Sequence, residues 1–315
     1  MQELFIGDAI KRRREELGLT QEELCEGICE PLTISRLENG KNLPSYGCIK
    51  ALLQRLGMPD KRYYALLSKH DREIRDVRKE LLSCTSRFTR ALADRKKQVW
   101  TLAMEQLHRL EEMADKDDNI TRQFILSQRA VLGTETGPYS PAERRDLFLR
   151  ALRLTTPQFD LKNIGAHRYT VDETRLISQI ALVYSDTGEH ETAVAIYQQL
   201  YEYVHKNDDR LSNYAPHFTL IAYNYARELV LCKYYHDAIK IAEEGQRVGI
   251  DYAYYDFLGS SLALLGECYY QVGEMEQSRK LYLQAHFLCE ILKDERSLKV
   301  IDPDIRERFG IEFPI

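Results

Sequence analysis

The chain has 315 residues, of which 44% are hydrophobic, and its formal net charge is -5. This length exceeds one ordinary domain and the apolar share is sufficient for packed cores, so two domains are expected. Prolines and glycines are few and no strand-like alternation of useful length occurs, which predicts an all-α fold. The N-terminus has no apolar signal segment and no apolar run of about eighteen residues occurs, so we expect a soluble, cytosolic protein without a membrane partner.

The first predicted element is a short helix that begins after Thr20. Thr20 is a good N-cap, and Glu23 follows three residues later, which is the spacing of a capping box. Leu24 and Ile28 then lie on one face of the predicted helix. We therefore expect this face to pack in a core.

A second short helix follows a tight turn. Pro31 suits a first helical position, where its missing N–H costs nothing, and Gly40 can take the left-handed conformation that ends the helix. Ile34 and Leu37 are expected to face inward. The outward positions of the first turns are then Leu32, Thr33 and Arg36, which is where a DNA-reading helix meets base edges in the major groove.

This helix-turn-helix resembles that of the Xre/Cro-type repressor family, from roughly Leu4 to Leu67. The matching segments are Lys11–Arg14, Leu17–Leu19, Thr20–Leu24, Ile34–Lys41, Pro44–Ser45 and Leu52–Gly57. The resemblance implies that double-stranded operator DNA is the partner. The DNA-contacting positions that it implies are Gln21, Leu32, Thr33, Ser35, Arg36, Asn39 and Lys41.

The resemblance also assigns roles. Gln21, Asn39 and Lys41 would hold phosphates, whereas Thr33 and Arg36 would face bases. Arg14 would pair with Glu38 and so lock the first helix of the domain onto the recognition helix. The sequence departs from the family at Pro31 and Leu32, where many relatives carry polar side chains, so base reading there is either an apolar contact or absent.

The charge balance requires the DNA contact to be a local patch. Residues 1–69 hold 11 Lys and Arg against 10 Asp and Glu, and residues 70–315 hold 33 against 39. Phosphate binding needs basic groups on one face, and not a basic domain average. The net negative charge of residues 70–315 argues against a second nucleic-acid-binding surface there.

Seven cysteines are scattered through the chain, which fits reduced thiols. Cys25 and Cys29 are four residues apart, a spacing that can begin a metal site, but no further ligand follows at a suitable distance and Cys48 stands alone. Buried small hydrophobes are the better interpretation. We expect neither a metal nor a cofactor.

From His70 onward the apolar spacing is helical, with Ile74, Val77 and Leu81 followed by Leu82, Phe88, Leu92, Val99 and Trp100. This segment predicts a linker helix and the first helix pair of a second domain, and Gly133–Pro141 marks a loop. The predicted domains are therefore residues 1–67, which bind DNA, and residues 68–315.

An internal repeat organises the second domain. Ala181, Tyr184, Gly188, Ala193 and Tyr197 align with Gly266, Tyr269, Gly273, Ser278 and Tyr282, with identical offsets between members. A weaker copy comprises Ala226, Leu229, Lys233, Ala238 and Ala242. The pattern resembles the tetratricopeptide repeat, although the spacing between copies is longer than in that family. It implies antiparallel helix pairs that stack into an α-solenoid whose first helices line a concave surface.

Fifteen of the twenty tyrosines fall between Tyr184 and Tyr282. Those at repeat core positions are expected to pack. In this alignment the inward-facing positions of the first helices hold the candidate ligand residues. Among them, the side-chain amide of Asn224 can bind a peptide backbone through both its oxygen and its NH₂ group. The candidate ligand residues are Ser178, Leu182, Tyr223, Asn224, Arg227 and Glu267, with Ala263 at an equivalent place.

A helix-turn-helix joined to tetratricopeptide repeats resembles the RRNPP regulators, which bind DNA as dimers and sense short peptides. The resemblance implies a homodimeric transcription regulator of the quorum-sensing type, gated by a peptide in the repeat domain. The alternative is an interaction protein that controls a signalling partner such as a response regulator, with DNA binding secondary. An enzyme is not expected, because the sequence contains no HExxH, no phosphate-cradling Gly-rich loop and no Gly-x-Ser-x-Gly.

Overall fold

The computed structural model describes residues 6–58, 69–91, 93–134, 137–206 and 211–313, and in these ranges the regular elements are helices and one isolated bridge between Thr134 and Gly137. The predicted all-α fold is confirmed. The chain divides into two compact units, Met1–Val183 (unit 1) and Tyr184–Ile315 (unit 2). The domain boundary predicted between residues 67 and 68 lies outside the described residues.

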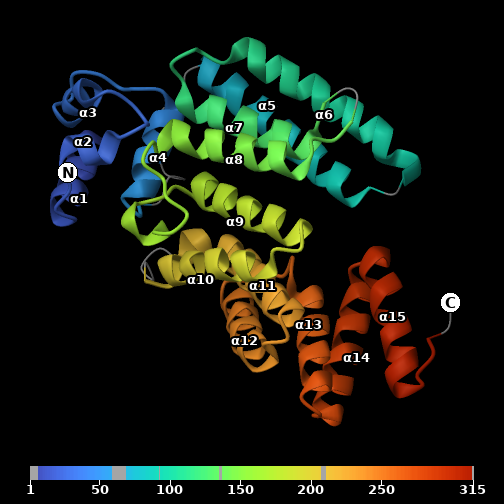
Figure 1. The fold of residues 1–315 in the computed structure, drawn as a ribbon. Coiled ribbons are helices and arrows are strands. Elements are labelled where there is room, and N and C mark those ends of the chain that lie inside the picture. The colour runs from blue at the N-terminus through green and yellow to red at the C-terminus, as the bar shows by residue number, and fades with distance from the viewer. Residues whose placement is uncertain (1–5, 59–68, 92, 135–136, 207–210, 314–315) are drawn as a thin grey trace. The chain divides into compact units, whose positions relative to one another are not determined.

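Figure 1 shows the helices in chain order. Those that begin in unit 1 are α1 (Ile6–Glu16), α2 (Gln21–Cys25), α3 (Pro31–Glu38), α4 (Tyr46–Arg55), α5 (Lys69–Arg90), α6 (Ala93–Met113), α7 (Asn119–Leu132), α8 (Pro141–Thr155), the short 3₁₀ helix Ile164–Ala166 and α9 (Val171–Asp186). Those of unit 2 are α10 (His190–Lys206), α11 (Leu211–Leu231), α12 (Tyr235–Asp251), α13 (Leu258–Gln271), α14 (Met275–Ile291) and α15 (Glu295–Phe309).

Helices α1 to α4 form the head, residues 6–58. The capping box predicted at α2 is present, since the Glu23 amide donates to the Thr20 hydroxyl and the Glu23 carboxylate accepts from the Thr20 amide. Helix α2 is shorter than the sequence predicts. It ends at Cys25 because Gly27 has φ +69°, a left-handed conformation that breaks the helix and leaves Ile28 in the turn before α3.

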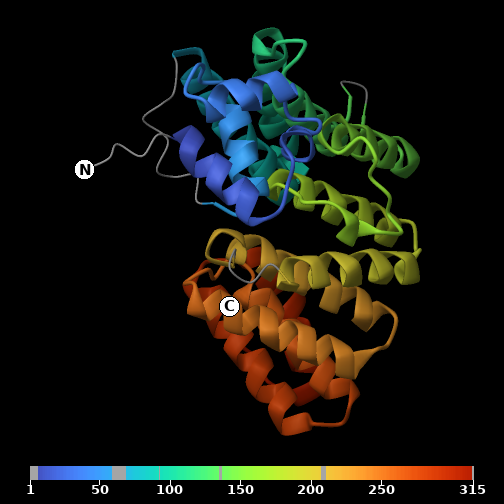
Figure 2. The same ribbon diagram turned by 90° about the vertical axis from the view of Figure 1, so that its left-hand side faces the viewer.

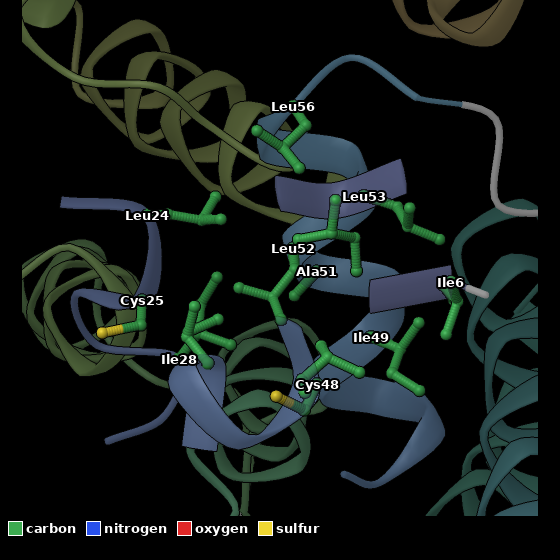
Figure 3. Close-up of a cluster of buried hydrophobic side chains, with 13 residues drawn as sticks. Ile6, Leu24, Cys25, Ile28, Cys48, Ile49, Ala51, Leu52, Leu53 and Leu56 are labelled. Carbon is green, nitrogen blue, oxygen red and sulfur yellow. The ribbon is translucent and has the colours of Figure 1, made fainter. Parts of the chain in front are cut away.

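The core of the head gathers apolar side chains from all four helices (Figure 3). Its buried members are Ile6, Ile10, Leu24, Cys25, Ile28, Ile34, Leu37, Cys48, Ile49, Ala51, Leu52, Leu53 and Leu56. The predicted inward residues Leu24, Ile28, Ile34 and Leu37 are all in this core. The sequence interpretation placed the recognition helix in the correct rotation about its axis.

Cys25 and Cys48 are buried in the same core, whereas Cys29 is half-buried against it. Cys48 is distant from the other two in the sequence, but in the fold Cys29 is hydrogen-bonded to both Cys25 and Cys48. The hydrogen bond to Cys25 would lower the pKa of Cys29, but the bond to Cys48 and burial outweigh it and raise that pKa to about 12. The hydrogen bond with Cys29, followed by burial, raises the pKa of Cys25. The thiols of Cys25 and Cys29 therefore stay protonated at neutral pH and behave as small apolar groups.

The rest of unit 1 is the body, helices α5 to α9. Helices α5 and α6 pack as one pair and α7 and α8 as another, and α4 of the head lies beside α7 (Figure 1 and Figure 2). Val77 and Leu81 are buried in the body core, as predicted. Leu82 is not, because it is 41% exposed on the other side of α5.

In unit 2, α11 packs on α12 and α13 on α14, which gives the helix pairs of a tetratricopeptide-like repeat. The aligned positions Gly188, Lys233 and Gly273 all have positive φ, at 82°, 65° and 88°. Lys233 and Gly273 lie in the turns within the α11–α12 and α13–α14 pairs, and Gly188 lies in the turn between α9 and α10. The alignment made from the sequence is therefore matched by the backbone, including the copy in which lysine replaces glycine.

The aligned small residues let paired helices approach closely. A Cβ added to Gly266 would lie 2.7 Å from the ring of Tyr282, and the Ser278 hydroxyl donates to the Gly266 carbonyl at 2.7 Å. Tyr197 and Tyr282 are buried as predicted, whereas Tyr184 and Tyr269 are half-buried. Within the described part of the chain, no helix is long and apolar enough to cross a membrane.

Candidate DNA-binding and ligand-binding faces

The candidate DNA-binding face is the outer side of α3. Ile34 and Leu37 are fully buried and fix the rotation of the helix, so that Leu32 is 58% exposed and Arg36 is exposed. Thr33 and Ser35 are half-buried. The first turn of α3 has no acidic side chain. A face with one cation and one large apolar side chain suits a guanine edge and a thymine methyl group.

A buried ion pair holds α3 onto α1, as the resemblance implied. Arg14 Nε donates to Glu38 Oε1 at 2.7 Å, and Arg14 Nη2 donates to Glu38 Oε2 at 2.9 Å. The hydrogen bond to Glu38 raises the pKa of Arg14 against the opposing effect of burial. Arg14 Nη1 also donates to the Leu19 carbonyl at 2.8 Å. A bidentate pair with these additional bonds fixes both side chains geometrically.

The amide of Gln21 takes part in this network, which the sequence interpretation did not anticipate. Gln21 Nε2 donates to Glu38 Oε2 at 2.7 Å. Its side chain thus supports the Arg14–Glu38 pair, and a phosphate contact by Gln21 stays a prediction. Asn39 and Lys41 are exposed just beyond α3, and Asn39 Nδ2 donates to the Ser35 carbonyl at 2.7 Å.

Four of the predicted ligand residues lie in unit 2. Tyr223 on α11 stacks on Phe257, with ring centroids 5.8 Å apart and an interplanar angle of 26°. Asn224 is 9% exposed. Arg227 Nη2 donates to Glu228 Oε1 at 2.8 Å, whereas its buried Nε has no partner among the described residues. Buried polar atoms of this kind normally have partners.

Burial alone would lower the pKa of Arg227, but the hydrogen bond and charge of Glu228 raise it. The arginine is therefore a permanent cation, and its buried Nε has no hydrogen-bond partner among the described residues. Tyr223, Asn224 and Arg227 together present an aromatic face, an amide and a positive charge. These groups suit the backbone and an acidic group of an extended peptide.

Glu267, the fourth residue, is engaged by the chain itself. Its carboxylate forms an ion pair with Arg308 of α15 and accepts hydrogen bonds from Tyr282 Oη at 3.0 Å and Gln271 Nε2 at 2.8 Å. Burial would raise the pKa of Glu267, but the hydrogen bonds from Gln271 and Arg308 lower it. Helix α15 thus occupies a position that the sequence interpretation assigned to a ligand.

The remaining two predicted ligand residues belong to unit 1. Ser178 is 2% exposed and Leu182 is half-buried, both on α9. A ligand role for either residue stays a prediction.

The fold and the exposed α3 face define a helix-turn-helix protein with tetratricopeptide-like repeats, and comparison with known families places it further. The family described as helix-turn-helix matches residues 10–60, and the family described as the RNPP family C-terminal domain matches residues 101–301. The chain belongs to the RNPP family. No curated protein sequence matches it.

Solved structures share the fold at low sequence identity. Bacillus thuringiensis PlcR in complex with the peptide PapR7 and DNA is 18% identical with a TM-score of 0.57, and the match covers 94% of this chain and 98% of that chain. The apo form of PlcR is 16% identical with a TM-score of 0.58, over 94% and 97% of the two chains. At such identity the likeness shows the common fold.

Proposed function

We propose that this protein is a sequence-specific DNA-binding transcription regulator whose unit 2 binds a short signalling peptide and which acts as a homodimer. The observation that carries the DNA-binding part is the outer face of α3, held in place by Arg14 and Glu38 with Leu32 and Arg36 exposed. PlcR, which shares the fold, has been crystallised with a peptide and DNA together, and this supports both parts of the proposal.

The DNA-binding part is tested by selecting binding sites from random-sequence duplexes with the wild-type protein. Arg36→Ala should weaken binding to the selected site by roughly 1–3 kcal/mol, the usual worth of a base-reading contact, and should relax the preference at one position of the site. Arg150→Ala is a matched control, because Arg150 is an exposed arginine on α8. Failure to select any sequence would contradict the proposal, and full discrimination by the Arg36 variant would contradict the assigned α3 face.

The ligand part rests on Tyr223, Asn224 and Arg227 of α11, because Asn224 is a buried amide and Arg227 has a buried Nε without a hydrogen-bond partner among the described residues. An amide donates and accepts at once, so it can pair with both polar groups of one peptide unit. A peptide carbonyl that accepts from Arg227 Nε supplies a hydrogen bond that this buried atom lacks among the described residues.

The corresponding measurement is a titration of short synthetic peptides, beginning with those encoded as exported products beside the gene. Asn224→Ala should weaken binding of a recognised peptide by roughly 1–3 kcal/mol, because its backbone loses two hydrogen bonds. Asn163→Ala, at an exposed position of unit 1, should bind as the wild type does. Equal affinity for both variants would remove Asn224 from the site.

A further inference from the structure

Arg55 joins the head to the body through contacts that no sequence motif indicates. It ends α4, is 5% exposed, and its Nη1 donates to the carbonyls of Leu24 and Glu26 at 3.2 and 2.5 Å. Its Nη2 donates to the Thr155 carbonyl at 2.5 Å and to Glu173 Oε1 at 3.3 Å. One guanidinium therefore connects the end of α2 with the end of α8 and the first turn of α9.

Several hydrogen bonds position the Glu173 carboxylate for its ion pair with Arg55. Its Oε2 accepts from the Thr170 amide at 2.5 Å, and the Glu173 amide donates to the Thr170 hydroxyl at 3.2 Å, which is a capping box at the start of α9. Its Oε1 accepts from the hydroxyls of Thr155 and Thr156 at 2.5 and 2.9 Å. The carboxylate is fully buried and accepts from four donor groups, so the pair with Arg55 has a fixed geometry.

Gly27 permits the close approach of head and body. A Cβ at this position would lie 2.4 Å from the Thr155 carbonyl oxygen, and the residue has positive φ. The Gly27 carbonyl accepts from Asn119 Nδ2 of α7 at 3.2 Å. At the other side of Arg55, Gln54 Oε1 accepts from the Val171 amide at 3.2 Å. The head is thus held by α7, α8 and α9 at once.

The contacts of Gly27, Gln54 and Arg55 with the body use the turn between α2 and α3 and the C-terminal end of α4. The proposed DNA-reading side chains are elsewhere, and Leu32 and Arg36 stay exposed while the head is held. The attachment is therefore compatible with DNA binding, and it determines the direction in which α3 faces relative to the body.

We propose that Arg55 and Glu173 are positioning residues for DNA binding, which hold the head on α7, α8 and α9 so that head and body move as one rigid piece. This inference rests on the proposed function. A head on a flexible tether would be ordered only when both half-sites of an operator are occupied, at a cost in affinity. A head already held by its body meets DNA in a defined orientation, and the distance between the two heads of a dimer then becomes a property of the protein.

Half-site spacing is the readout that separates positioning from a merely structural role. The probes are duplexes from the selection described above, carrying either one half-site or two half-sites with the spacer varied. Lengthening the spacer by about five base pairs turns the second half-site to the opposite side of the duplex. For the wild type this change should lower affinity at least about tenfold, toward that of the single half-site.

Glu173→Gln and Arg55→Lys should lose most of this spacing dependence and weaken binding at the best spacing, with single half-site affinity unchanged. Arg78→Met is the matched control. Arg78 pairs with Asp172 at 3.2 Å, in the same turn of α9, and lies over the ring of Phe124, so both of its partners are in the body. The control should keep the wild-type spacing profile.

Two milder variants keep the test available if Glu173→Gln or Arg55→Lys does not fold. Thr156→Val removes one hydrogen bond to Glu173, and Asn119→Ala removes the bond to Gly27; circular dichroism melting verifies that each protein is folded. A wild type with no spacing dependence, or folded variants with the wild-type profile, would overturn the inference. A wild type that selects no DNA at all would instead contradict the proposed function.

Discussion

Glu38 accepts three hydrogen bonds through a side chain that is only 2% exposed, two from Arg14 and one from Gln21. Removing one partner of a buried ion pair leaves the other charge without compensation in a place from which water is excluded. The orientation of α3 therefore depends on a residue that does not itself face DNA.

We expect Glu38→Ala to lower the free energy of unfolding of the head by about 3–5 kcal/mol, because Arg14 would remain buried with only the exposed carboxylate of Glu15, at 3.5 Å, as an ionic partner. Urea unfolding followed by circular dichroism measures the change. Glu16→Ala is the control: it breaks the Arg13–Glu16 pair at 3.1 Å, whose side chains are 30% and 50% exposed, and should cost at most about 1 kcal/mol. Equal effects of the two substitutions would show that the buried pair has no special role.

Local signals in the sequence were sufficient to predict much of the structure of the head. The capping box at Thr20, the inward face with Ile34 and Leu37, and the left-handed Gly40 at φ +68° each depend on residues only a few positions apart. The Gln21–Glu38 bond and the Cys29–Cys48 contact join residues 17 and 19 positions apart without a periodic pattern. Such contacts follow from tertiary packing, which a single sequence does not display.

At the scale of elements, the turn between paired helices is the most regular feature of unit 2. Gly188 and Gly273 take the left-handed conformation without cost from a side chain, whereas Lys233 takes it with a Cβ. A lysine in this conformation stores backbone strain. The turn after α11 is thus the weakest of the three by this criterion.

Lys233→Gly should stabilise unit 2 by roughly 0.5–1 kcal/mol, since the strain is relieved while the unfolded chain gains some freedom. The reverse change, Gly273→Ala, should destabilise it by about 1–2 kcal/mol. The comparison is matched, because a Cβ at Gly273 meets no atom within 4 Å and only the backbone conformation is at issue. Thermal unfolding of both variants tests the pair, and opposite signs are required.

The repeat could be found from the sequence because its members recur at fixed offsets. The position of α15 could not, because Arg308 reaches Glu267 across 41 residues and belongs to no repeat copy. Glu267 was assigned to a ligand face by register alone. The structure instead gives it an internal partner, and this leaves Tyr223, Asn224 and Arg227 as the stronger ligand candidates in unit 2.

At the scale of the whole molecule, the proposed operator recognition requires two heads. One recognition helix contacts too few bases for strong selection among genomic sites, and two half-sites about one helical turn, roughly 34 Å, apart are the usual solution. We therefore expect the full-length protein to sediment as a dimer at micromolar concentration. Analytical ultracentrifugation without DNA is the measurement, and a monomer across that range would contradict the prediction.

The Arg55–Glu173 contact also has a consequence for biosynthesis, because its partners are 118 residues apart. A nascent chain presents its N-terminal part first, so the four helices of the head emerge from the ribosome long before α9 does. Until α7 and α8 have also emerged, Nη2 of Arg55 has no partner in the body, and the surface around Gly27 has no covering. A translation product interrupted before residue 119 would carry a head with its own core but without the contacts to α7, α8 and α9, and such a fragment would compete for single half-sites while lacking the spacing selectivity of the finished protein.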